Sequence, residues 1–212
     1  MRLTREKFIL YISGLLILTL GISLAIQSRL GTSPFDALLV GLYRTVGLTV
    51  GSWEIIVGAV MVLCNAIALR RRPEYLALLT SFITGLGIDF WLFVVRDWLV
   101  PETMIGQFIC LGAGLLLSGL GIATYLQANF APIPMDGSML VVHELTGLNV
   151  AISRILLNIV LVTFAFFFHG PIGIGTIIIA LSSGPIINFL MPYIAKLEKG
   201  MTKQKQCLTS SG

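Results

Sequence analysis

Two short stretches of the chain place a carboxylate two residues after a proline. Ser33-Pro34-Phe35-Asp36 follows the first long apolar segment, and Ile133-Pro134-Met135-Asp136 follows another such segment one hundred residues later. Proline suits the first turn of a helix, and an acidic side chain there meets the positive end of the helix dipole. Within a membrane, such carboxylates can bind a substrate, a cation or a proton. They can also serve only as helix caps, and the spacing fits both interpretations.

A third carboxylate, Asp89, stands inside a long apolar segment. It lies about 21 Å from the start of that segment at the helical rise per residue. An ionised carboxylate at this depth costs several kcal/mol unless it is paired or hydrated, so intramembrane charges are candidates for function. The alternatives are a fixed ion pair with Arg44 or Arg29, or a place nearer the membrane interface.

Amide side chains add further candidates. Gln27 and Gln127 end two long apolar segments, and Asn188 occupies the place in the second half of the chain that Asp89 has in the first. Each amide can contact a substrate, or it can form an interhelical hydrogen bond worth about 0.6–2 kcal/mol.

The sequence offers no constellation typical of an enzyme or a metal centre. The two histidines and three cysteines do not cluster at metal-ligand spacing. Gly85-x-Gly87-x-Asp89 is similar to the Gly-x-Gly-Asp of intramembrane aspartyl proteases, but its aspartate comes one residue late and no second motif follows. Walker, His-x-x-x-His and Ser-His patterns do not occur. We therefore expect no enzyme activity, no bound metal and no cofactor.

The composition is that of a polytopic membrane protein. Of 212 residues, 56% are hydrophobic and 11% are charged, and the mean hydropathy is +0.94. The net charge of +4 comes from basic residues that flank apolar segments, as in cytoplasmic loops, and not from a nucleic-acid-binding patch. The expected partners are the lipid bilayer, a small-molecule or ion substrate, and a second copy of the chain or a partner membrane protein.

Six segments are long enough to cross a bilayer as helices, which takes about 20 apolar residues. These segments are 8–28, 51–69, 75–95, 104–127, 150–168 and 172–194. Two shorter segments, 34–46 and 134–146, are predicted to be half-helices. Pro34 and Pro134 suit their first turns, and Gly47 and Gly147 suit their ends.

The chain reads as two similar units, residues 1–100 and 101–195, followed by a basic tail at 196–212. Each unit contains three full crossings, an odd number, so the second unit is expected to enter the membrane from the opposite face. We thus predict an all-α membrane protein of six transmembrane helices and two half-helices, built as inverted repeats of about 100 residues. The matching positions include Gly14-Leu15-Leu16 with Gly114-Leu115-Leu116, Leu20-Gly21-Ile22 with Leu120-Gly121-Ile122, and Glu54 with Arg154.

Loop charges give the expected orientation. With both termini in the cytoplasm, the Arg70-Arg71-Arg72 cluster and the lysine-rich tail also fall on the cytoplasmic side. If the half-helices crossed as well, the units would be parallel and this arginine cluster would lie outside. We further expect Glu54 and Arg154 at the membrane interface, and the glycines spaced by seven in each first span to allow close helix packing.

Several motifs resemble the YczE/YitT-type family of bacterial integral membrane proteins, and most closely its YczE branch. They are Leu30-Gly31-Thr32-Ser33-Pro34-Phe35-Asp36, then Gly41-Leu42, Thr45-Val46-Gly47-Leu48-Thr49-Val50-Gly51 and Trp53. The similarity covers nearly the whole chain up to Lys199. It implies a multi-pass plasma-membrane protein of bacteria whose molecular activity is not established, and it supplies neither a substrate nor catalytic residues.

Our leading hypothesis is a small transporter or permease with a site between the two units near the bilayer midplane. The competing hypothesis is a non-transporting accessory or scaffold protein that acts with a partner. A water-filled path at the centre would favour transport, and a dry, apolar centre would oppose it. The candidate site residues are Asp36, Asp136, Asp89, Asn188, Gln27 and Gln127.

Overall fold

The computed structural model describes residues 5–96, 98–128 and 130–209, which form eight helices and no strand. Six of these helices are long and apolar enough to cross a membrane. The predictions of an all-α fold and of six helices able to span a membrane are thus confirmed. The long helices are α1 (Arg5–Gln27), α3 (Val50–Leu69), α4 (Tyr75–Val95), α5 (Met104–Gln127), α7 (Val150–Phe167) and α8 (Ile174–Thr209).

The two half-helices, α2 (Pro34–Val46) and α6 (Pro134–Thr146), begin and end where the sequence predicts. Each has 13 residues, or about 20 Å of helix, which is too short to span the hydrocarbon layer. Both are followed by a glycine with positive φ, Gly47 at 94° and Gly147 at 69°. Glycine adopts this left-handed conformation without the steric cost that other residues incur.

Helices α1 and α5 cross at the centre with their backbones in contact. A Cβ atom on Gly21 would lie 2.4 Å from the Ser118 nitrogen, and a Cβ on Gly121 would lie 2.4 Å from the Leu18 nitrogen. Gly14 and Gly114 are equally crowded by the opposite helix. The glycines spaced by seven therefore allow an approach that larger residues would prevent, as the sequence predicts.

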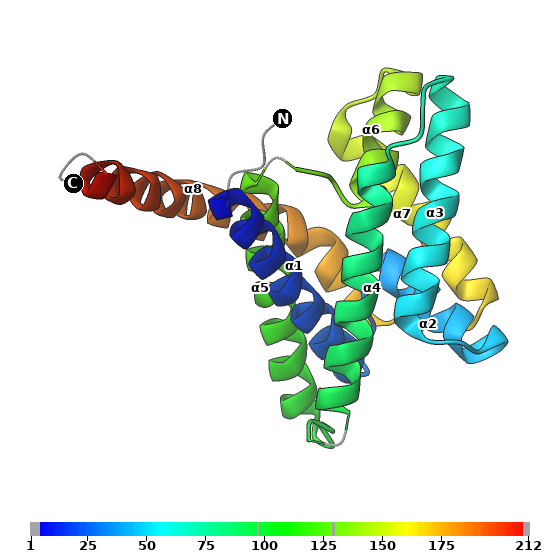
Figure 1. Cartoon of the computed structure of the whole chain (residues 1–212). Coiled ribbons are helices and arrows are strands. Elements are labelled where there is room, and N and C mark those ends of the chain that lie inside the picture. Colours follow the sequence, from blue (N-terminus) through cyan, green and yellow to red (C-terminus); the bar gives the residue numbers. More distant parts are fainter. Residues whose placement is uncertain (1–4, 97, 129, 210–212) are drawn as a thin grey trace.

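The remaining helices surround this central pair (Figure 1). Helix α4 packs on α1, and α8 packs on α5. Each half-helix packs on long helices from both halves of the chain: α2 lies against α7 and α3, and α6 lies against α3 and α7. Figure 1 shows α2 and α6 toward opposite ends of the bundle, with the α3–α4 connection at the α6 end.

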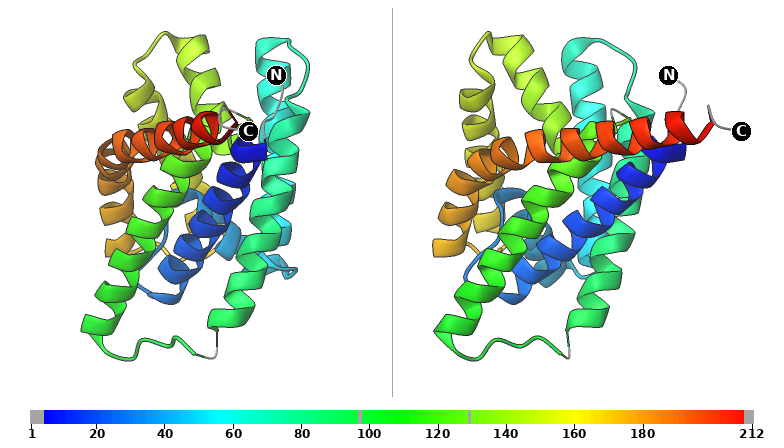
Figure 2. Two further views of the ribbon diagram at one scale, coloured as in Figure 1. Left: turned by 60° about the vertical axis from the view of Figure 1, so that its left-hand side comes forward. Right: turned by 90° about the vertical axis from the view of Figure 1, so that its left-hand side faces the viewer.

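The last helix is longer than the sequence predicts. We expect the final span to end at 194 and a separate tail to follow, but α8 continues as one helix to Thr209. Its stretch suited to a membrane ends at Lys196. Two prolines, Pro185 and Pro192, lie inside this helix, and Figure 2 shows that it bends and that its last part runs crosswise to the other helices. Proline removes a backbone hydrogen bond and crowds the preceding turn, which accounts for such a bend.

The α1–α5 crossing yields a first prediction. Gly121→Ala should destabilise the protein by about 1–3 kcal/mol, because overpacking a tight contact costs about that much. Thermal unfolding of the purified protein in detergent measures the effect as a lower Tm.

Gly112→Ala is the matched control on the same helix, since a Cβ there would have no atom within 4 Å. Its Tm should equal or exceed that of the wild type, because alanine favours helix over glycine. An equal decrease in Tm for the two variants would show that the close approach of α1 and α5 does not depend on glycine at position 121.

Candidate functional site

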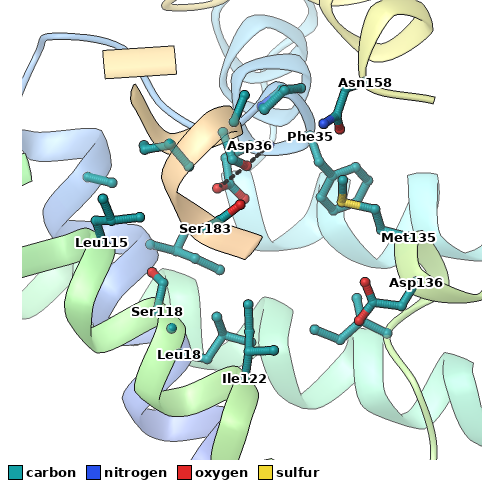
Figure 3. Close-up of a pocket in the computed structure, with 18 of the residues that line it drawn as sticks. Leu18, Phe35, Asp36, Leu115, Ser118, Ile122, Met135, Asp136, Asn158 and Ser183 are labelled. Carbon is teal, nitrogen blue, oxygen red and sulfur yellow. Dashed lines mark hydrogen bonds between the residues drawn. The ribbon is translucent and has the colours of Figure 1, made fainter. Parts of the chain in front are cut away.

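A cavity of about 120 Å³ lies at the centre of the bundle, which is room for several water molecules. All eight helices or the turns next to them contribute to its wall (Figure 3). Apolar side chains make up more than half of the lining, and polar groups interrupt them at defined places. The polar lining residues are Ser33, Asp36, Glu54, Thr84, Ser118, Asp136, Arg154, Asn158 and Ser183.

The lining draws on matching positions of the two halves of the chain. Both half-helices present their first turns to the cavity, so the two Pro-x-Asp stretches meet there. In Figure 3, Asp36 and Asp136 flank the cavity, with Phe35 and Met135 between them. The pairs of matching residues in the wall are Leu18 and Ser118, Ile22 and Ile122, Phe35 and Met135, Asp36 and Asp136, and Glu54 and Arg154.

Asp36 and Asp136 are not the side-chain caps of their helices. At α2 the cap is Ser33, whose Oγ accepts from the Asp36 nitrogen at 3.2 Å and donates to Asp36 Oδ2 at 2.6 Å. At α6 no side chain caps the helix, and Tyr125 donates its hydroxyl to Asp136 Oδ2 at 2.8 Å. Among the described residues, neither carboxylate accepts a backbone N–H. Both side chains therefore keep an oxygen available to the cavity.

Glu54 is the functional candidate that sequence reasoning missed. The expectation that it lies at the membrane interface is wrong, because it is only 3% exposed and lines the central cavity. Thr84 donates to its Oε1 at 3.1 Å, and Asp36 lines the same cavity. The signal in the sequence was the match between Glu54 and Arg154, opposite charges at equivalent places of a repeat.

Arg154 and Asn158 bring polar groups from α7. Arg154 is half-buried and lines the cavity, yet the one salt bridge among the described residues lies elsewhere, between Arg71 and Glu144. Asn158 Oδ1 is buried without a hydrogen-bond partner. Because an unpaired buried polar atom costs about 1–3 kcal/mol, this oxygen is suited to accept a hydrogen bond from a molecule in the cavity.

The other sequence candidates lie outside this cavity. Asp89 contacts the start of α3, where its Oδ1 accepts from the Gly51 nitrogen at 2.8 Å and its Oδ2 accepts from the Thr49 hydroxyl at 2.5 Å. It therefore pairs with a helix N-terminus, and neither proposed arginine contacts it in the described structure. Asn188 is exposed, and Gln27 and Gln127 are half-buried last residues of α1 and α5.

A second cavity, of about 250 Å³, lies at the α6 end between α3, α4 and α6. Pro134 belongs to its wall, whereas the adjacent residues Ile133, Met135 and Asp136 line the central cavity. The first turn of α6 is therefore the partition between the two cavities. The Arg71–Glu144 salt bridge, at 2.7 Å, joins the α3–α4 connection to the end of α6 at the rim of the second cavity.

The α2 end of the bundle is tightly closed. In the turn before α2, the Leu30 oxygen accepts from the Gly175 nitrogen at 2.9 Å, and the Thr32 nitrogen donates to the Pro171 oxygen at 3.3 Å. A Cβ on Gly170 would lie 2.2 Å from the Ala37 oxygen, so backbone meets backbone there. The first nine residues of α2 are all buried, whereas only Pro134 and Ser138 are buried in α6.

No group of three or more His, Cys, Asp and Glu side chains in the described structure could hold a metal ion. The chemistry available at the centre is thus that of carboxylates, one guanidinium, hydroxyls and an amide. These groups bind charged or polar molecules, and the apolar wall around them favours a ligand with an apolar body.

Comparison with known proteins places the chain among bacterial relatives. Uncharacterized protein YyaS of Bacillus subtilis (strain 168) is 47% identical over 190 residues, which cover 90% of this chain and 94% of the relative. Uncharacterized membrane protein YczE of the same organism is 36% identical over 192 residues, covering 90% and 88%. An uncharacterized protein of Haemophilus influenzae is 29% identical over 186 residues, covering 87% and 83%.

No solved structure matches the chain. The similarity to YczE confirms the resemblance found in the sequence motifs, and it agrees with six helices able to span a membrane. A family model matches residues 5–192, which is nearly all of the described structure. The chain is a membrane protein and belongs to the family of unknown function DUF6198.

Proposed function

We propose that this protein is a small transporter that binds its substrate between two inverted repeats. The observation that carries the proposal is the central cavity, which receives the first turns of both half-helices and matching side chains from both halves of the chain. Half-helices that point their N-termini at a site between repeats are a recurring way to build transporter sites. A role in binding and moving a molecule accounts for this arrangement better than an enzymatic role does.

The orientation that we propose has the N-terminus and α8's end in the cytoplasm of a bacterial cell. Supporting this, the Arg70-Arg71-Arg72 cluster belongs to the α3–α4 connection, which lies at the α6 end of the bundle. Since basic loops stay in the cytoplasm, the α6 end is the cytoplasmic end and the α2 end faces outward. The second cavity then opens toward the cytoplasm.

The different packing of the two half-helices supports alternating access. Backbone contacts close the α2 end, whereas a cavity of about 250 Å³ lies between α6, α3 and α4 at the other end. Two repeats of similar sequence can adopt each other's packing, which would close the α6 end and open the α2 end. This difference supports a two-state carrier in which the α6 end is the looser end, with the first turn of α6 between the central site and the second cavity.

Cysteine accessibility tests the inverted arrangement with a matched pair of positions. Gly137→Cys and Ala37→Cys occupy the same place in α6 and α2, in a background in which the three native cysteines are serine. Gly137 lines the second cavity, and a Cβ there would have only the Asn65 amide nitrogen nearby, at 3.7 Å. A membrane-impermeant maleimide should label Gly137→Cys from the cytoplasmic side of inside-out vesicles.

Ala37 is fully buried, so Ala37→Cys should react much more slowly and only from the outer side of right-side-out vesicles. Labelling of both positions from one side would contradict the inverted repeat. An accessory protein with a fixed structure would be favoured if Gly137→Cys alone were labelled and its labelling rate were the same in every condition tested.

Uptake measurements test the role of the cavity carboxylates. Asp36→Asn and Glu54→Gln should each lower substrate accumulation by about tenfold or more, because losing 1.4 kcal/mol of binding is already a factor of ten. The comparison is between metabolite profiles of cells that express the wild type or a variant at equal level. Glu102→Gln, a change of an exposed loop carboxylate, serves as the control and should leave the profile unchanged. If both cavity variants gave the wild-type metabolite profile, the two carboxylates would have no role in substrate transport.

A further inference from the structure

We infer that the central cavity takes a monovalent organic cation with an apolar body, such as a protonated amine or a quaternary ammonium, in exchange for a proton. This inference rests on the proposed transport function and names its substrate class. It draws on the charges, the unpaired polar atoms and the wall of the cavity.

The charges that face the cavity sum to about minus one. Asp36, Glu54 and Asp136 carry three negative charges when ionised, and Arg154 carries one positive charge. Each half-helix N-terminus adds about half a positive charge, which partly offsets the aspartate of its own first turn. One negative charge therefore remains, and a single cation or a single proton balances it.

Glu54 is the residue least compensated by the protein. It stands in the second turn of α3, beyond the first turn in which the helix dipole acts, and is 3% exposed. Its hydrogen-bond partner is the neutral Thr84 hydroxyl, and no described Lys or Arg forms a salt bridge with it. A buried charge without a partner is strongly unfavourable, so Glu54 requires either a bound cation or a proton.

The wall indicates what kind of cation fits. Leu18, Ile122, Met135 and Phe35 line the cavity, so most of a ligand's surface would contact hydrocarbon. The face of the Phe35 ring also attracts cations. An inorganic ion would lose its hydration shell to these side chains without gaining enough oxygen ligands. An alkylated or aromatic ammonium instead buries its apolar body and leaves its charge beside the carboxylates.

An independent observation points to a ligand with a hydrogen-bond donor or a partial positive charge. Asn158 lines the same cavity, and its Oδ1 is buried with no hydrogen-bond partner in the described structure. An N–H group, or the positively polarised methyl groups of a quaternary ammonium, would satisfy this oxygen. An anion would place like charge beside it.

Proton exchange follows because the cation and the proton would balance the same negative charge in the cavity. The titratable side chains that line the cavity come from α2, α3, α6 and α7, namely Asp36, Glu54, Asp136 and Arg154, and Tyr125 of α5 donates to Asp136. Helices α1, α4 and α8 add no titratable side chain to the lining. When a cation enters, the carboxylate that held the proton releases it, and when the cation leaves, a proton returns.

Binding to the purified full-length protein in lipid nanodiscs tests the inference. The probe is benzyltrimethylammonium, and three compounds of similar size accompany it: neutral neopentylbenzene, anionic 3-phenylpropionate and zwitterionic phenylalanine. Calorimetry should detect binding of the cation alone. Its affinity should rise with pH by up to tenfold per pH unit where one proton is displaced, because the deprotonated site binds the cation. A pH indicator in weakly buffered solution should register about one proton released per cation bound.

Two charge variants make the test sharper. Glu54→Gln should lower cation affinity at least tenfold and abolish proton release, while the exposed-loop control Glu102→Gln changes neither. Arg154→Gln removes the positive charge and should leave cation binding equal or tighter. If Arg154 instead held a substrate carboxylate, 3-phenylpropionate or phenylalanine would bind to the wild type, and this variant would abolish that binding.

Other outcomes would overturn the inference. Binding or uptake of the anion or the zwitterion, with the cation excluded, refutes the substrate class but leaves the transport proposal standing. Cation binding that is independent of pH and of Glu54 refutes the exchange mechanism. If none of the four probes binds, the inference fails, and the uptake and labelling experiments then decide separately on the transport function.

Discussion

The close approach of α1 and α5 is the constraint on which the rest of the structure depends. Four glycines, Gly14, Gly21, Gly114 and Gly121, let the two backbones meet where any side chain would clash. Because these helices touch directly, the turns that follow them bring α2 and α6 to the same central region from opposite ends of the bundle. The cavity is thus a consequence of the crossing, since without it the two Pro-x-Asp turns would stand apart.

The same repeated sequence is packed differently at the two ends, and the proposed alternating access rests on this difference. At the α2 end, Gly170 and Gly173 allow the α7–α8 connection to reach the backbone of α2 and of the turn before it. At the α6 end, the corresponding connection carries Arg71, whose salt bridge with Glu144 spans the rim of an open cavity. Exposed salt bridges contribute little stability, typically below about 1 kcal/mol, so this contact can open and close at small cost.

The sequence predicts much of this architecture because strong local signals coincide with the repeat. Proline at each start and glycine at each end set the bounds of the half-helices, and the spacing of Gly14 and Gly21 indicates the crossing. Side-chain environment was harder to predict. Asp89 is deep in its helix by residue count, but the neighbouring helix starts beside it, so it pairs with the Gly51 nitrogen. Glu54 is near the start of its own helix, yet α4 and α2 pack against that start.

Pulsed electron-spin distance measurements test the central claim, that the two ends of the bundle open in alternation, most directly. One label pair, at Arg72 and Leu140, flanks the second cavity, and the other, at Arg44 and Ile172, flanks the closed α2 end. The account predicts two label-to-label distances for each pair. Protonation or substrate should lengthen the distance at one end of the bundle and shorten it at the other. A single, unchanging distance at each end, or shifts in the same direction, would contradict it.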